Sequence, residues 1–143
     1  MGLLDRLLRR GRPDPPPDYP DDGTLELLLT ADDAARGDSA VLAEAQERGV
    51  ALDRPLLVRH HLVRLPDETA VERARELLGQ DGYRLTVLDG PPYAVRACRT
   101  QVLTVLSASQ ERSRMAGLAQ RLGGDVAGYD VLGPRDDTPD QQG

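Results

Sequence analysis

Apolar residues are concentrated in one stretch of the chain, Leu56–Leu65, which reads Leu-Leu-Val-Arg-His-His-Leu-Val-Arg-Leu. Pro55 precedes this stretch and Pro66 follows it. Proline lacks the backbone N–H that a strand interior uses, so both prolines are natural strand boundaries. A short apolar run between such boundaries is typical of a buried strand, and we predict that the rest of the fold is organised around it.

The alternation within this stretch separates two different faces, because successive side chains of a strand point to opposite sides of the sheet. The sets are Leu56, Val58, His60 and Leu62 on one face, and Leu57, Arg59, His61, Val63 and Leu65 on the other. The first set suits a core covered by helices, with His60 hydrogen-bonded to a neighbour. The second set places a fixed charge and a titratable ring among apolar residues, which suits a partly open side of the sheet.

The segments that follow predict a complete small domain. Asp67 is a natural N-cap for a helix over residues 67–78, and Glu68 adds favourable charge to its first turn. Further apolar patterns predict strands at residues 83–88 and from residue 93 toward residue 106, a helix at 109–122 and a last strand at 126–132. The order β-α-β-β-α-β is typical of an α+β, ferredoxin-like fold. We therefore expect a four-stranded antiparallel sheet with strand 56–65 central and two helices on one face.

The N-terminal part of the chain divides into shorter pieces. Residues 1–11 predict a short amphipathic helix, and residues 12–23 form a linker rich in Pro and Asp. The folded domain spans residues 24–132 and begins with an N-terminal extension. In this extension, residues 25–29 are too short for periodicity to distinguish strand from helix, and a helix follows at 40–48. Residues 133–143 form a polar, acidic tail that we expect to be disordered.

Composition narrows the possible functions. The 143 residues suit one domain, and the formal net charge of -6 argues against a dedicated nucleic-acid-binding protein and favours a basic partner. Phe and Trp are absent, as are Lys, Asn and Ile, so every fixed cation is an arginine and the composition indicates a bacterial genome rich in GC. Cys98 is the single cysteine, and the N-terminal apolar pattern is too short for a membrane span and is not that of a signal peptide. We expect a cytoplasmic protein.

The residues that could take part in catalysis or metal binding do not form a recognisable site. His60 and His61 are neighbours on a strand and face opposite ways, so they do not suit one metal ion. A Cys98–His61 dyad lacks an identifiable orienting residue, and no phosphate-binding glycine loop or nucleophile motif occurs. The sequence therefore predicts no catalytic residue, no cofactor and no metal.

The open face of the sheet is the more informative surface. Arg59, His61 and Arg84 fall on it, and the register adds Arg96, with Thr86, Cys98 and Thr100 nearby. RNA-binding sheets stack bases on aromatic residues of their central strands, and these strands lack them, so direct nucleic-acid binding is disfavoured. An acidic protein surface, or the chain's own acidic linker, fits this basic patch better. A solvated face without a specific ligand remains the alternative.

Several motifs in order along the chain resemble the regulator of ribonuclease activity B family, the protein inhibitors of ribonuclease E. The resemblance runs from about residue 38 to residue 132. Its motifs are Val58-Arg59-His60-His61-Leu62, the acidic helix start Asp67-Glu68, Gly82-Tyr83, Leu118-Ala119, Gly123-Gly124 and Gly128-Tyr129. Where the family has Tyr-Asp-Gly-Trp, this chain has Val126-Ala127-Gly128-Tyr129.

The resemblance implies a ferredoxin-like, non-enzymatic regulator that binds a ribonuclease E-type enzyme and modulates RNA decay. We expect the contact to use a basic, flexible segment of that enzyme. Acidic surfaces would make that contact. The candidate partner-binding residues are Asp67, Glu68, Glu72, Glu76, Arg59, His61 and Arg84. A small-molecule-sensing domain and a generic protein-interaction domain of the same fold remain alternatives, and the oligomeric state stays open.

Overall fold

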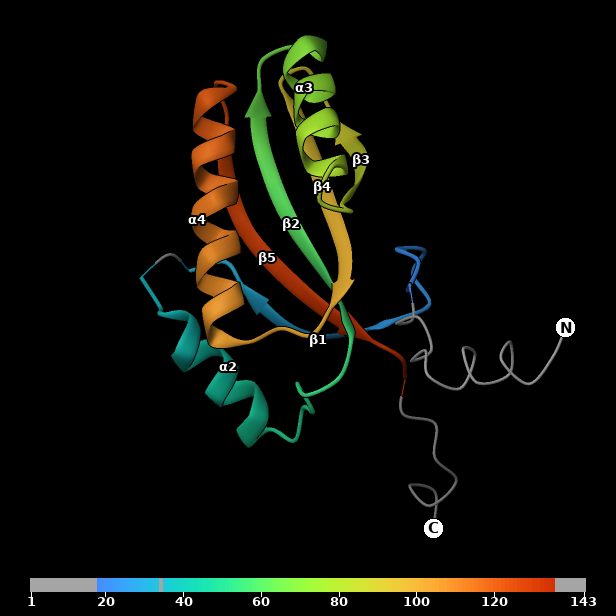
Figure 1. Cartoon of the computed structure of the whole chain (residues 1–143), viewed down its shortest axis with the longest axis vertical. Helices are drawn as coiled ribbons and strands as arrows, with labels where there is room; N and C mark the ends of the chain where they lie inside the picture. The colour runs from blue at the N-terminus through green and yellow to red at the C-terminus, as the bar shows by residue number, and fades with distance from the viewer. Residues whose placement is uncertain (1–17, 34, 136–143) are drawn as a thin grey trace, which may run out of the picture.

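The structure, a computed structural model, describes residues 18–33 and 35–135. The predicted helix at residues 1–11, the first half of the linker and the tail beyond residue 135 lie outside the described residues, and the division of the chain into four segments stays a prediction. The described residues form five strands and three helices, in the α+β arrangement that Figure 1 shows. In chain order the elements are β1 (Glu26–Ala31), α2 (Asp38–Glu47), β2 (Leu56–Leu65), α3 (Glu68–Gly79), β3 (Arg84–Asp89), β4 (Tyr93–Gln101), α4 (Val105–Arg121) and β5 (Asp125–Gly133).

The sheet has the strand order β1-β5-β2-β4-β3, and every neighbouring pair is antiparallel. The central position predicted for β2 is confirmed. The prediction of a four-stranded sheet is wrong, because β1 adds a fifth strand by pairing with β5. The apolar run at residues 25–29 was too short to be assigned from sequence, and its partner lies about a hundred positions further along the chain, where Leu132 pairs with Leu27.

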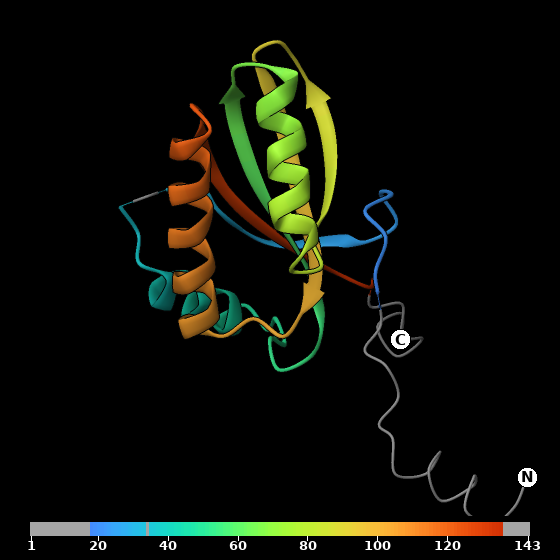
Figure 2. The ribbon, with the colours of Figure 1, turned by 45° about the horizontal axis from the view of Figure 1, so that its top comes forward.

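Helices α3 and α4 lie on the same side of the sheet, as predicted (Figures 1 and 2). Under them, Val58 and Leu62 of β2 are fully buried at 0% exposure, which confirms the predicted core face. Helix α2 packs against β1 and α4 at the end of the sheet where β2 begins. Within the described residues, none of the helices is both long and apolar enough to cross a membrane.

The last helix begins four residues earlier than predicted. Thr104 caps α4 by accepting a hydrogen bond from the Ser107 backbone N–H at 3.0 Å, and the Ser107 hydroxyl accepts one from the Thr104 N–H at 2.9 Å. This reciprocal pair fixes the helix start. Strand β4 therefore ends at Gln101, and the apolar residues that followed it in the sequence enter a connection and the first turn of α4.

The face opposite the helices is not fully open. Residues 18–25, Asp-Tyr-Pro-Asp-Asp-Gly-Thr-Leu, lie against it as an irregular segment that we call the acidic strap. Tyr19 and Leu25 of the strap pack on an apolar cluster of Leu57, Cys98 and Leu132. Leu57, predicted on the partly open face, is for this reason buried.

Candidate functional site

The centre of the strap-covered face is a group of charged residues on β2 and β5. Arg59 donates to Asp130 over 2.8 Å through one terminal nitrogen and to Asp21 of the strap over 3.0 Å through the other. His61 Nε2 lies 2.7 Å from the same Asp130 carboxylate. The β2–β5 register places Arg59 directly beside Asp130, so the strands themselves create this pair.

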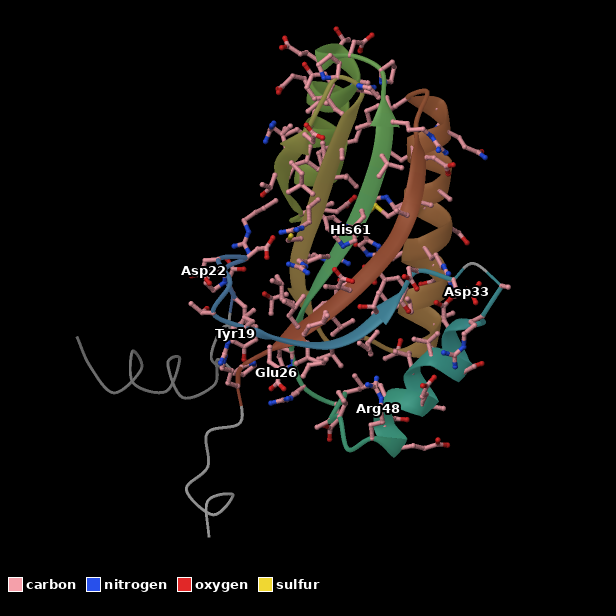
Figure 3. All side chains as sticks on the ribbon, turned by 180° about the vertical axis from the view of Figure 1, so that it is seen from behind. Tyr19, Asp22, Glu26, Asp33, Arg48 and His61 are labelled. Carbon is pink, nitrogen blue, oxygen red and sulfur yellow. The ribbon has the colours of Figure 1, made fainter. Side chains whose placement is uncertain are left out.

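Two further arginines of this face hold the strap. Arg96 on β4 donates to Asp21 over 2.8 Å, and Arg84 on β3 donates to Asp18 over 2.9 Å. The alternative that the chain's own acidic linker fits the basic patch is confirmed by these contacts. Figure 3 views the sheet from this side and shows Tyr19, Asp22 and His61 on it.

The carboxylates of this face are held in their ionised form. Burial alone would raise the pKa of Asp21, but the hydrogen bonds from Arg96 and Arg59 outweigh it and lower that pKa. In the same way, burial opposes the hydrogen bonds from His61 and Arg59 at Asp130, whose pKa is also lowered. The ion pairs therefore persist at neutral pH.

Cys98 is not an activated nucleophile. Its Sγ lies 3.5 Å from Asp21, and burial together with that negative charge raises the pKa of the thiol to about 12. The thiolate is the reactive form, so this environment suppresses reactivity. His61 is engaged with Asp130, and the structure gives no support to a Cys98–His61 dyad.

The other face of β2 carries a buried polar group that we call the helix-side cluster. Glu111 of α4 accepts hydrogen bonds from the Tyr83 hydroxyl at 2.6 Å and from Gln101 at 2.6 Å. His60 Nε2 lies 3.4 Å from Glu111, and an Arg99 nitrogen lies 3.3 Å from it. The prediction that His60 faces the core and contacts a neighbour is confirmed, whereas Glu111 was missed by sequence reasoning.

The helix-side cluster stabilises an ionised carboxylate beneath α4. Burial would raise the pKa of Glu111, but hydrogen bonds involving His60, Tyr83 and Gln101 lower it to about 2. Burial and the hydrogen bond to Glu111 raise the pKa of Tyr83. Glu111 thus stays ionised and the Tyr83 hydroxyl stays protonated near neutral pH, and their hydrogen bond helps to hold α4 on the sheet.

A small cavity lies beside His60. It has a volume of about 100 Å³ and is lined by Asp32, His60, Arg112, Met115, Val126, Ala127, Gly128 and Tyr129. The Tyr129 hydroxyl donates to Asp38 over 3.0 Å, and Arg112 donates to the same carboxylate oxygen over 3.0 Å. Sites for drug-sized ligands typically measure about 300–1,000 Å³, so this cavity is too small for one. Across residues 18–33 and 35–135, His, Cys, Asp and Glu side chains form no group of three or more that could hold a metal ion.

The predicted acidic surface lies on α3, on the side of the sheet away from the strap. Asp67 is used as the N-cap and accepts the Ala70 N–H at 2.8 Å. The side chains of Glu72 and Glu76 are 70% and 62% exposed. Glu72 pairs with Arg75 at 3.3 Å and Glu76 with Arg73 at 3.4 Å, so two arginines interrupt the acidic row. The structure therefore separates the predicted partner-binding residues into two surfaces, and their role in binding stays a prediction.

The fold and these surfaces define a small α+β protein with a charged surface on each side of one sheet. The family model described as regulator of ribonuclease activity B matches residues 36–131, which is more than half of the chain. The chain belongs to this family, and the resemblance seen in the sequence is confirmed. Searches of curated proteins and of solved structures gave no match. The acidic strap and β1 precede the matched residues, whereas the arginines that hold the strap lie within them.

Proposed function

We propose that this protein binds a ribonuclease E-type enzyme in the bacterial cytoplasm and lowers its cleavage of RNA without catalysing a reaction itself. The observation that supports the proposal is the family match over residues 36–131, because members of that family regulate ribonuclease activity. The contact is between two proteins, and the partner's binding segment is basic and flexible.

The exposed row of α3 is the surface that suits such a segment. Glu68, Glu72 and Glu76 line a shallow depression together with Thr69 and Arg73. The ion pairs of Glu72 and Glu76 with arginines of the same helix are exposed, and such pairs contribute only about 0–1 kcal/mol to stability. A partner's Arg or Lys side chains can therefore replace them at little cost.

Small-molecule sensing is the alternative, but the cavity beside His60 does not favour it. That cavity has a volume of about 100 Å³, which leaves space for a few water molecules rather than for a metabolite. Generic protein interaction without a ribonuclease remains distinguishable by experiment, because it predicts no effect on RNA cleavage.

The test is a titration of the purified protein against the full-length ribonuclease at about 50 and 300 mM salt, with RNA cleavage measured in parallel. The variant Glu72→Arg/Glu76→Arg should bind more weakly than the wild type while its unfolding free energy changes little. A matched control is Glu44→Arg/Glu47→Arg, which makes the same change in net charge on α2, where both side chains are exposed.

Each result has a defined meaning. Absence of binding at the lower salt would reject the partner. Equal weakening by the α2 and α3 variants would show that net charge, rather than the α3 surface, governs association. Tight binding that is insensitive to salt and to both variants would keep the partner and reject the electrostatic mechanism.

A further inference from the structure

The acidic strap is held in the manner of a bound peptide. The Tyr19 backbone N–H donates to the Thr100 hydroxyl over 2.9 Å, and the Tyr19 carbonyl accepts from Arg84 over 2.7 Å. The sheet thus contacts both backbone polar groups of one strap residue, Tyr19. These contacts depend on the main chain, and any peptide with the same backbone path could make them.

Side chains add chemical selectivity to this site. Arg59 and Arg96 both donate to the Asp21 carboxylate, at 3.0 and 2.8 Å, and Arg84 donates to Asp18. The Asp21 side chain is only 12% exposed, so its charge is well shielded from solvent. Tyr19 meanwhile packs on the apolar cluster formed by Leu57, Cys98 and Leu132. The site therefore accepts two carboxylates with an apolar side chain between them.

We propose that this face of the sheet is a binding site for an acidic peptide segment of a partner protein. The strap of the same chain occupies this site intramolecularly, and the partner segment displaces it. Arg59, Arg84 and Arg96 recognise the carboxylates, Thr100 recognises the backbone, and the apolar cluster receives the aromatic or aliphatic residue between them. The inference is independent of the proposed ribonuclease contact, which uses α3 on the other side of the sheet.

The strap leaves part of the site unused. In the described part of the chain, the Nε atoms of Arg59 and Arg96 are buried and have no hydrogen-bond partner. Buried donors without an acceptor cost free energy. A ligand that places an acceptor within reach of these atoms would have an advantage over the strap.

A peptide fits this site better than RNA does. The face carries an acidic residue of its own, Asp130, directly beside Arg59. The strands beneath the strap present Thr100, Cys98 and Leu57 rather than the aromatic platforms on which single-stranded bases stack. Removing the strap would expose three arginines and one aspartate, a patch of limited positive charge in a protein of net charge -6.

The strap lowers the apparent affinity for any competitor, because only the fraction of molecules with an open site can bind. The variant Asp18→Asn/Asp21→Asn removes both carboxylate anchors and should increase that fraction. A matched control is Asp22→Asn/Glu47→Gln, which makes the same change in net charge at exposed residues that do not contact the arginines. Tyr19→Ala is a second way to open the site and leaves every charge in place.

The probe is a fluorescein-labelled synthetic peptide with the sequence of residues 16–26, and its binding to the full-length chain is measured by fluorescence anisotropy. Both opening variants should bind the peptide about tenfold more tightly than the wild type and the control do. Adding Arg96→Gln to either opening variant should remove that gain. Circular dichroism establishes that each variant is folded.

Three outcomes would overturn the proposal. One is equal peptide affinity of the folded opening variants and the wild type. Another is retention of the gain after Arg96→Gln. The third is binding of a labelled ten-nucleotide single-stranded RNA to the opened site more tightly than the peptide, which would assign the site to phosphate rather than to a protein carboxylate. None of these results bears on the α3 titration, in which the strap stays intact.

Discussion

Replacing Glu111 by glutamine should destabilise this protein and change its response to acid. Glu111 is 8% exposed and accepts hydrogen bonds from Tyr83 and Gln101 while lying within 3.4 Å of His60 and 3.3 Å of Arg99. Glutamine has the same shape but carries no charge. Its amide nitrogen cannot accept the hydrogen bond that Gln101 now donates.

The magnitude follows from the change in pKa. The pKa of Glu111 falls from 4.5 to about 2 on folding. At about 1.36 kcal/mol per unit, this shift corresponds to about 3 kcal/mol of stability. Because the folded pKa is lowered, that stability is fully present above pH 4.5 and is lost as the pH falls through about 2. We expect Glu111→Gln to lose about 2–3 kcal/mol at pH 7 and to show a shallower loss between pH 4.5 and 2 than the wild type.

The assay is urea unfolding followed by circular dichroism at pH 7, 4 and 2.5. Asp21 and Asp130 also have lowered pKa values, so the wild type retains other sources of acid sensitivity and the comparison between the two proteins is the decisive quantity. Glu72→Gln, at a side chain that is 70% exposed, is the control and should change stability by less than about 0.5 kcal/mol. Parallel pH profiles for the wild type and Glu111→Gln would refute the assigned role of the carboxylate.

Three further predictions concern the core, the sheet and the thiol. Leu62→Ala should cost about 2–5 kcal/mol in urea unfolding, whereas Leu27→Ala, at a residue that is 55% exposed, should cost far less; similar losses would show that the core is misassigned. Gly128 has a φ of 111° and an added Cβ would overlap the Ala31 carbonyl, so Gly128→Ala should lower the melting temperature and speed hydrogen exchange in β1; an unchanged melting temperature would contradict this. The Cys98 thiol should react with Ellman's reagent at least about 100-fold more slowly in the native protein than in the unfolded protein, and comparable rates would show that the thiol is not suppressed.

The periodicity of one strand was sufficient to predict much of the sheet. The alternation in β2 correctly assigned Val58 and Leu62 to the core and His60 to the helix side, because burial of one face repeats every second residue. Strand β1 could not be assigned in the same way. Its three leucines form no alternating pattern, and its strand conformation depends on pairing with β5.

Glu111 shows a different limit of sequence reasoning. It lies one helical turn before Met115, on the apolar stripe that also contains Leu118 and Ala119. A charged residue on such a stripe is the signal that could have revealed the helix-side cluster. Its partners could not be named, since Tyr83 and Gln101 come from other elements and only the register of the sheet brings them together. The strap had no periodicity to interpret, and its Asp-rich composition indicated the basic patch as a target without giving a contact.

Both outer strands of this sheet restrict how another chain could add to it. Strand β3 pairs regularly with β4 until a register shift between Val87 and Asp89, and β1 pairs with β5 around a shift between Leu27 and Leu29. A shift of this kind bends a strand and interrupts the even row of backbone donors and acceptors that a new strand requires. Each edge therefore offers only a few consecutive residues to an incoming strand. Uncontrolled edge-to-edge assembly is discouraged for the same reason, and both binding surfaces that we propose lie on the broad sides of the sheet rather than at its edges.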